Sequence, residues 1–188
     1  MPGYLAQIDF LALFVLLVMG QQIIAGHYKI KPPKDIKKLP NEKIFRLLSL
    51  LLVSVGFMVQ MKTVPMVLFI AGLATSFAGV ALALWAQVVL GRNWVPGIGL
   101  YRNHKLVTSG PYRLVRHPIY TGISLLFFGG AIMCANPALF FAAIAMSLSL
   151  IIRFPLEEAA LKKKFGKRWN QYEKSTGSFL PRFRQSPR

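Results

Sequence analysis

The chain has 188 residues, of which 54% are hydrophobic and only 15% are charged, and its mean hydropathy is +0.48. Soluble domains carry about 25% charged residues, so this composition argues against a water-soluble globule. Lys and Arg number 23 against 6 Asp and Glu, which gives a net charge of +17. Because the basic residues lie between long apolar runs, they indicate membrane lipids as partners and no nucleic acid. The only cysteine, Cys134, excludes an intrachain disulfide and a cysteine-cluster metal site.

Long uncharged runs predict the membrane spans. The first run follows a segment without Lys or Arg, so we interpret it as a retained transmembrane helix rather than a signal peptide. The last run, 118–152, contains the turn signal Asn136-Pro137 near its middle, which predicts two short helices joined by a tight hairpin. We therefore expect an all-α integral membrane protein with five transmembrane helices, at 10–26, 47–61, 63–91, 119–135 and 138–153.

The basic residues also predict the orientation of the chain. Seven Lys and Arg fall within 27–46, five within 92–117 and ten from 153 onward, whereas the other side of the membrane has only Lys62. Under the positive-inside rule the N-terminus faces outward and the three basic segments face the cytoplasm. We expect a multi-pass protein, in the inner or plasma membrane if the source is bacterial. The sequence leaves the oligomeric state open.

The connector before the fourth predicted span concentrates polar and aromatic residues at the membrane surface. Residues 104–122 read His-Lys-Leu-Val-Thr-Ser-Gly-Pro-Tyr-Arg-Leu-Val-Arg-His-Pro-Ile-Tyr-Thr-Gly. This segment can be interpreted as a basic connector with a Gly-Pro turn, in which Pro118 starts the next helix. A connector of 26 residues, 92–117, is nevertheless long for a small bundle, and loops of that length are usually functional.

The segment after the fifth predicted span predicts a C-terminal amphipathic helix. Glu157, Leu161 and Tyr172 are spaced for one helical face, and the lysines between them could contact lipid headgroups. The neighbouring acids Glu157 and Glu158 lie just past the membrane exit, where a carboxylate is costly unless a cation is near. Arg153, four residues before Glu157, could supply that cation as an ion pair, or a ligand could supply it.

Two separated motifs carry a resemblance to a known family. The first is Gly110-Pro111-Tyr112 followed by Arg116-His117-Pro118, Tyr120 and Gly122. The second is Arg153 with Glu157-Glu158, Phe165-Gly166, Tyr172 and Leu180-Pro181, and Cys134 and Asn136-Pro137 stand between the two. In this order they resemble the isoprenylcysteine carboxyl methyltransferase family, part of a wider group of membrane methyltransferases that includes phospholipid N-methyltransferases. The resemblance covers about residues 91–181, nearly half of the chain.

The resemblance implies an enzyme that uses S-adenosyl-L-methionine, with a cofactor pocket built from the connector and the C-terminal helix. It assigns Glu157 to hold the cofactor and Arg153 to the substrate side, where we expect Arg153 to be the catalytic group. At Gly97, where some eukaryotic members have a cofactor-binding glutamine, this sequence departs from the pattern. The other implied cofactor positions are His104, Lys105, Leu106, Val107, Tyr112, His117, Pro118, Ile119 and Tyr120.

The chemistry of that cofactor agrees with these residues. Its sulfonium and ammonium are cations, which in a protein of net charge +17 need local carboxylates and aromatic faces. Glu157 and Glu158 can supply the carboxylates, and we expect both to bind the cofactor. Tyr112 and Tyr120 can supply the aromatic faces. Methyl transfer is an in-line displacement, so the protein has to position two groups and exclude water, and no metal is expected.

The remaining polar groups concern the cofactor carboxylate and the acceptor. The carboxylate needs a hydrogen-bond donor, for which His117 or Arg116 is suitable. If the acceptor is a carboxylate, it is ionised at neutral pH and needs only a guide such as Arg153. If the acceptor is an amine, a base has to remove a proton.

We therefore predict a membrane methyltransferase whose active site faces the cytoplasm and whose acceptor is a lipophilic or lipidated molecule, foremost the carboxylate of a prenylated cysteine. A phospholipid or other lipid amine is the alternative acceptor. Alternatives of other classes are a small non-enzymatic transporter or scaffold, and a relative of the membrane sterol reductases, which use a nicotinamide cofactor. The predicted organisation is membrane helices in 1–90, the motif region in 91–181 and a basic tail in 182–188.

Overall fold

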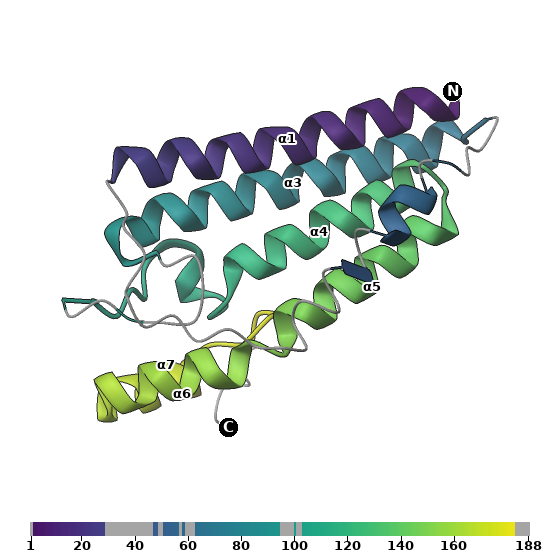
Figure 1. Ribbon diagram of the computed structural model, residues 1–188. Helices are drawn as coiled ribbons and strands as arrows, with labels where there is room; N and C mark the ends of the chain where they lie inside the picture. Colours follow the sequence, from purple (N-terminus) through teal and green to yellow (C-terminus); the bar gives the residue numbers. More distant parts are fainter. Residues whose placement is uncertain are drawn as a thin grey trace.

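The computed structural model describes residues 2–28, 47–48, 51–56, 58, 63–94, 100 and 103–182. Its α-helices are α1 (Gly3–His27), α3 (Met66–Leu90), α4 (Pro118–Met133), α5 (Pro137–Ile151), α6 (Phe154–Phe165) and α7 (Lys167–Ser175), and its short 3-10 helices are η1 (Gly91–Asn93) and η2 (Gly110–Arg113). The first four α-helices run side by side in the order α1, α3, α4, α5, and α6 and α7 lie at one end of them (Figure 1). Across the described residues β-pairing is limited to two isolated bridges, so the fold is all-helical there.

Within the described residues three segments are long and apolar enough to cross a membrane, namely Gly3–His27, Met66–Asn93 and Pro137–Phe165, and α4 is apolar but shorter. These segments confirm the expected helical integral membrane protein. Of the predicted second span, 47–61, the structure describes 47–48, 51–56 and 58, all of them helical. Because the rest of that span lies outside the described residues, the number of five spans stays a prediction.

The predicted hairpin between α4 and α5 is confirmed. Ala135 adopts a left-handed conformation with φ of 48°, which reverses the chain. The next residue, Asn136, caps α5 because its side-chain oxygen accepts hydrogen bonds from the N–H groups of Ala138, at 2.9 Å, and Leu139. The Asn136 side-chain amide also donates to the carbonyl of Gly56 at 2.8 Å, which fixes the turn to a neighbouring helical segment.

Small residues bring the backbones of α3 and α4 into direct contact. A Cβ atom at Gly79 would lie 2.5 Å from the carbonyl oxygen of Gly122, and one at Gly129 would lie 2.5 Å from the backbone nitrogen of Ser76. Ser76 itself donates a hydrogen bond to the carbonyl of Leu126 at 3.2 Å. Glycine and serine at such positions are the usual means by which membrane helices approach closely, since lipid gives no hydrophobic drive for association.

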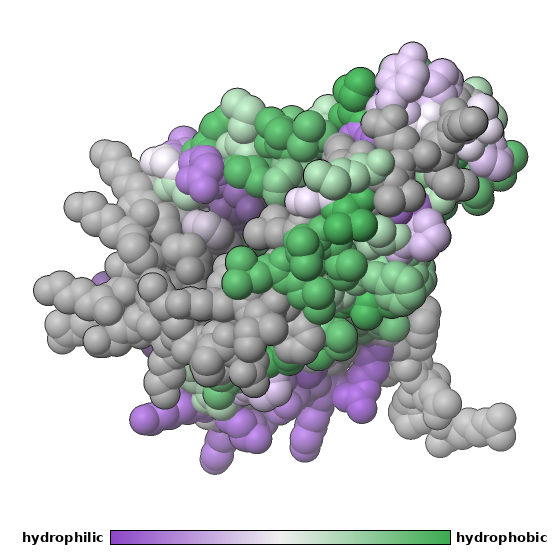
Figure 2. Space-filling model, turned by 45° about the vertical axis from the view of Figure 1, so that its right-hand side comes forward, coloured by the Kyte–Doolittle hydropathy of each residue, from purple (hydrophilic) through white to green (hydrophobic). Residues whose placement is uncertain are grey.

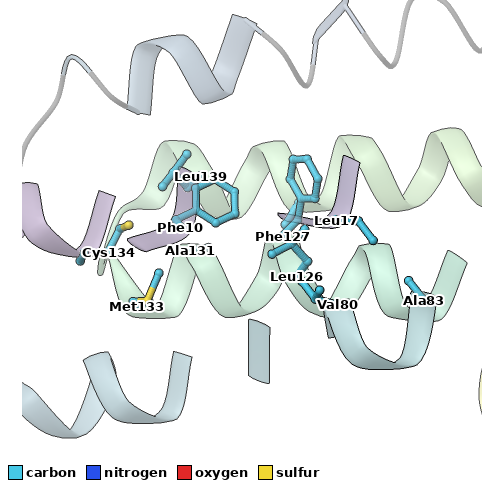
Figure 3. Close-up of a cluster of buried hydrophobic side chains, with 12 residues drawn as sticks. Phe10, Leu17, Val80, Ala83, Leu126, Phe127, Ala131, Met133, Cys134 and Leu139 are labelled. Atoms are coloured by element: carbon cyan, nitrogen blue, oxygen red, sulfur yellow. The ribbon is translucent and has the colours of Figure 1, made fainter. Parts of the chain in front are cut away.

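The apolar core lies where α1 and α5 cover this helix pair. Phe10 and Phe14 of α1 contact the ring of Phe127 in edge-to-face arrangements, with ring centroids 5.9 and 6.1 Å apart. Figure 3 shows this cluster, to which several elements contribute. Its labelled members are Phe10, Leu17, Val80, Ala83, Leu126, Phe127, Ala131, Met133, Cys134 and Leu139.

The C-terminal part corrects one prediction. The sequence predicts a single amphipathic helix, but the helix breaks at Gly166 into α6 and α7. Gly166 has φ of 52° and ψ of −120°, a conformation that glycine adopts readily and other residues avoid. The break lets α7 turn its Trp169 and Tyr172 side chains into the interior, where both are buried.

The glycine contact between α3 and α4 can be tested by substitution. Gly79→Leu should destabilise the folded protein by about 3 kcal/mol or more, because its side chain has to displace the α4 backbone. Gly26→Leu is the matched control, since a Cβ at Gly26 meets no atom within 4 Å. The measurement is the thermal unfolding midpoint of both variants in detergent. Equal unfolding midpoints of the two variants would show that the close contact between α3 and α4 does not contribute to the stability of the folded protein.

Candidate active site

A pocket opens at the end of the bundle where α3 ends and α4 begins. It encloses about 850 Å³ of empty space, part of it continuous with solvent. Its walls come from the end of α3, η1, the connector, the first turn of α4, α6 and α7. Segments far apart in the sequence therefore meet at one end of the fold, as Figure 1 shows for α4, α6 and α7.

Most of the predicted cofactor residues line this pocket. Two of the predicted cofactor residues, Pro118 and Glu158, do not line it. Arg153, which we predicted on the acceptor side, also lies outside the lining. Gly97 lies outside the described residues. The predicted residues that line the pocket are His104, Lys105, Leu106, Val107, Tyr112, His117, Ile119, Tyr120 and Glu157.

Pro118 has a structural position. It is the first residue of α4 and is fully buried. Proline suits a first helical turn because its fixed φ matches the helix and its missing N–H has no helical partner there. It starts the helix that carries Ile119 and Tyr120 into the lining, and its own predicted contact with the cofactor stays a prediction.

Glu157 is the carboxylate that faces the pocket. Its Oε1 accepts a hydrogen bond from the Tyr120 hydroxyl at 2.5 Å and lies 3.5 Å from Nε of Arg153, while its Oε2 lies 3.7 Å from Nδ1 of His117. The Arg153 guanidinium also lies over the Tyr120 ring, 5.7 Å from its centre. The ion pair between Arg153 and Glu157, left open by the sequence, is thus present at the expected spacing of four residues.

Glu158 lies next to Glu157 in sequence but points elsewhere. Its Oε1 lies 2.8 Å from Nε of Arg116, 3.0 Å from Nε2 of His117 and 3.0 Å from Oγ of Ser178. Successive side chains on an α-helix point about 100° apart, so only one of two adjacent acids can face the pocket. Glu158 therefore lies outside the pocket lining, and its predicted contact with the cofactor stays a prediction.

Arg116 holds the C-terminal strap, which we define as residues 176–182. Its Nη1 donates to the carbonyls of Glu173, at 3.1 Å, and Thr176, at 2.7 Å, and its Nη2 donates to Oγ of Ser178 at 3.0 Å. Its backbone N–H donates to the carbonyl of Gly177 at 2.8 Å. Because its Nε is also used, contacts among the described residues engage four of the five side-chain donors of Arg116.

One part of the pocket lining, made up of His104, Tyr112, Trp169 and Tyr172, is uncharged at neutral pH. Burial, with a smaller effect of Lys164, lowers the pKa of His104 to about 4, so its ring is neutral. The Tyr172 hydroxyl donates to the carbonyl of Tyr112 at 2.6 Å, and burial raises the pKa of both phenols. Trp169, almost fully buried, contacts Tyr172 edge to face at 5.6 Å.

The sequence did not identify several lining residues. Asn93 joins two walls, since its side-chain oxygen accepts a hydrogen bond from the backbone N–H of Lys105 at 2.7 Å. Nothing in the sequence around Asn93 indicates this contact. For Leu161 a signal exists, because it lies four residues after Glu157 and therefore on the same helical face. Arg116, named from the sequence as a possible donor to the cofactor carboxylate, also lines the pocket. The additional lining residues are Leu90, Asn93, Trp94, Leu100, Ala160, Leu161, Trp169 and Tyr172.

The strap contacts of Arg116 generate a prediction. Arg116→Lys keeps the charge but cannot reach four acceptors, so we expect the C-terminal strap to lose about 2 kcal/mol or more of local stability. Amide hydrogen exchange at 176–180 should then become at least tenfold faster. Arg113→Lys is the control, since Arg113 is exposed and its side chain makes no hydrogen bond or ion pair with the described residues. Unchanged amide hydrogen exchange at 176–180 in the Arg116 variant would show that Arg116 does not hold the C-terminal strap in place.

Comparison with known proteins places this geometry in a family. A family model described as phospholipid methyltransferase matches residues 67–168. A probable protein-S-isoprenylcysteine O-methyltransferase from Oryza sativa subsp. indica is 34% identical over 116 residues, which are 58% of this chain and 59% of the relative. A methanethiol S-methyltransferase from Pseudomonas deceptionensis is 33% identical over 76 residues, 40% of this chain and 28% of the relative. The chain thus spans less than two thirds of the length of either relative.

A solved structure shares the fold. The eukaryotic intramembrane Ras methyltransferase ICMT (isoprenylcysteine carboxyl methyltransferase), in a structure without a monobody, matches with a TM-score of 0.72 and 21% identity. The match covers 96% of this chain and 68% of that chain. Together with the rice relative it confirms the resemblance carried by the two motifs. Because residues 67–168 are more than half of the 188 residues, the chain belongs to the phospholipid methyltransferase family.

Proposed function

We propose that the protein is an integral membrane methyltransferase that uses S-adenosyl-L-methionine and methylates a lipophilic acceptor, foremost the carboxylate of a prenylated cysteine. The observation that carries the proposal is the pocket in which both sequence motifs meet around the Glu157 carboxylate. The names of two relatives support the reaction class, since one is a probable protein-S-isoprenylcysteine O-methyltransferase and the other is a methanethiol S-methyltransferase. The domain organisation predicted from the sequence, with the motif region in 91–181, is part of this proposal.

The pocket residues fit the chemistry of the cofactor, which supplies an activated methyl group on a sulfonium. Glu157 can accept hydrogen bonds from the cofactor ammonium, and the rings of Tyr112 and Tyr120 offer faces to a cation. The uncharged side around His104 and Trp169 suits a neutral heteroaromatic group.

Arg153 is proposed as the residue that bridges the two substrates. It pairs with Glu157 at 3.5 Å and lies at the turn between α5 and α6, where the apolar helix ends. A guanidinium there can orient an acceptor carboxylate toward the methyl group. The family description, phospholipid methyltransferase, favours a lipid amine as the second candidate acceptor, and that reaction would need a base in addition.

The acceptor class can be decided with purified protein. With labelled cofactor, wild-type protein should methylate a farnesylated cysteine analogue in preference to a phospholipid amine or a small thiol. Arg153→Lys should lower turnover on the carboxylate at least tenfold, because it loses the planar fork that grips both oxygens. Preferential methylation of the lipid amine would replace the first acceptor by the second. No methyl transfer to any acceptor would overturn the proposal.

A charge substitution tests the cofactor site directly. Glu157→Gln should weaken binding of S-adenosylhomocysteine about 10- to 150-fold, the value of a hydrogen bond to a charged group of about 1.5–3 kcal/mol. Glu173→Gln is the matched control, an acid on α7 whose side chain does not line the pocket. Calorimetry gives both affinities. Equal affinities of wild type and Glu157→Gln would show that this carboxylate serves its ion pair alone.

The proposal includes five spans, an outward N-terminus and a cytoplasmic site. The charge distribution of 22 basic residues against one supports this orientation. Figure 2 shows hydrophilic side chains gathered along the lower edge of the molecule and hydrophobic side chains above them. The lysines 162–164 of α6 are exposed and could bind anionic headgroups.

Labelling of cysteines tests that orientation. In a Cys134→Ser background, single cysteines placed within 27–46, 91–118 or 154–188 should not react with an impermeant reagent added to intact cells. The same positions should react after the cells are opened, which controls for access. Labelling of any of the three segments in intact cells would overturn the orientation and the cytoplasmic site.

A further inference from the structure

We propose that Trp169 is a specificity-determining residue whose indole Nε1–H donates a hydrogen bond to an uncharged acceptor atom of the ligand, a ring nitrogen of a heteroaromatic base. This inference rests on the proposed function, because the adenosyl group of the proposed cofactor carries such a base. Trp169 belongs to neither of the two sequence motifs, so its role is an addition to the residues that the sequence indicates.

Trp169 carries a buried hydrogen-bond donor that lacks an acceptor. The residue is only 1% exposed, and its Nε1 atom makes no hydrogen bond with any other residue that the structure describes. An indole N–H can only donate, so its hydrogen-bonding role does not depend on a protonation state. A buried N–H without an acceptor costs free energy, because it has given up its bond to water. Phenylalanine would pack there without that cost, so we expect a ligand to supply the acceptor.

The Trp169 ring is part of the pocket lining and is held in place by its neighbours. It packs edge to face on Tyr172, with ring centroids 5.6 Å apart and planes at 72°. The Tyr172 hydroxyl in turn donates to the carbonyl of Tyr112 at 2.6 Å, which joins α7 to the connector. A donor fixed in this way is in position before a ligand arrives, so little conformational entropy is lost on binding.

The neighbouring lining residues favour an uncharged partner for this donor. Burial lowers the pKa of His104 to about 4 and raises the pKa of the Tyr112 and Tyr172 phenols, so all three are neutral at pH 7. An anionic ligand group would lose its hydration among these residues without gaining a cation. A prenyl or acyl chain has no acceptor and would leave the Nε1–H unpaired. A neutral heteroaromatic ring offers a nitrogen acceptor together with a face that packs on tyrosine and tryptophan.

A purely structural role of Trp169 makes a different prediction. If Trp169 only packs α7 against the pocket, a change of its ring should affect every ligand of the pocket alike. If its N–H binds a ring nitrogen, loss of the N–H should weaken only ligands that have this nitrogen. Ligands that differ in a single ring atom therefore separate the two roles.

The test measures, by calorimetry, binding of S-adenosylhomocysteine and of its 1-deaza, 3-deaza and 7-deaza analogues, in each of which a CH group replaces one ring nitrogen. Wild type should bind one analogue about tenfold more weakly than the parent ligand, because that analogue leaves the donor unpaired. In Trp169→Phe, which keeps an aromatic ring without an N–H, this difference should disappear. Trp85→Phe is the control, since Trp85 is exposed and outside the lining. Equal binding of all four ligands by wild type, or a difference that persists in Trp169→Phe, would overturn the inference.

A second measurement does not require that Trp169→Phe folds. In ¹⁵N-tryptophan-labelled wild type the three tryptophans give three indole N–H signals, and Trp85→Phe and Trp94→Phe assign the Trp169 signal by elimination. This signal should differ between the complex with S-adenosylhomocysteine and the complex with the weakly bound deaza analogue, since only the first contains the hydrogen bond. The same signal in both complexes would overturn the inference and leave the proposed cofactor in place.

Adenosine, which carries the base without the amino acid, separates a failure of the inference from a failure of the proposed function. If S-adenosylhomocysteine does not bind but adenosine shifts the Trp169 signal, the proposed cofactor is wrong and the role of Trp169 in binding a base is supported. If neither compound binds, both the cofactor and this role of Trp169 are overturned.

Discussion

The close backbone contact of α3 with α4 is the constraint on which the candidate site depends. Gly79 and Gly122 let the two helices touch along antiparallel paths, so the end of α3 arrives beside the start of α4. Leu90 on one helix and Ile119 on the other then line the same pocket. The connector between them has to fold back over this end, and Asn93 fixes its return by binding the backbone of Lys105. A wider helix pair would separate these walls.

Charge placement at the site follows from the cost of carboxylates near the membrane. A partly buried acid is stable only when cations and donors compensate its lost hydration. Glu157 has Arg153 and the Tyr120 hydroxyl, and Glu158 has Arg116. Each glutamate thus has its own arginine, from a different part of the sequence. Within a chain of net charge +17, this pairing compensates both carboxylates locally.

The sequence predicted the elements that depend on local signals. Apolar runs gave α1, α3, α4 and α5, and Asn136-Pro137 gave the hairpin between the last two, because capping and proline act within a few residues. The sequence does not distinguish Glu157 from Glu158, because adjacent helical residues look equivalent in sequence and only the packing of α6 shows that Glu157 lines the pocket and Glu158 does not. The break at Gly166 was missed, since a glycine within an amphipathic pattern does not by itself reveal its φ. Contacts such as that of Asn93 depend on the fold of the whole connector.

The contacts by which Arg116 holds the C-terminal strap have a consequence for the order in which the protein folds during its synthesis. Arg116 leaves the ribosome well before its acceptors at Glu173, Thr176 and Ser178 exist. The membrane helices can therefore insert and pack while the pocket still lacks α7 and the strap. The pocket can become complete only after α7 and the strap have been synthesised, and both follow every described apolar helix in the sequence. A ligand of the pocket can stabilise the finished protein by mass action, but it has no complete site on the growing chain.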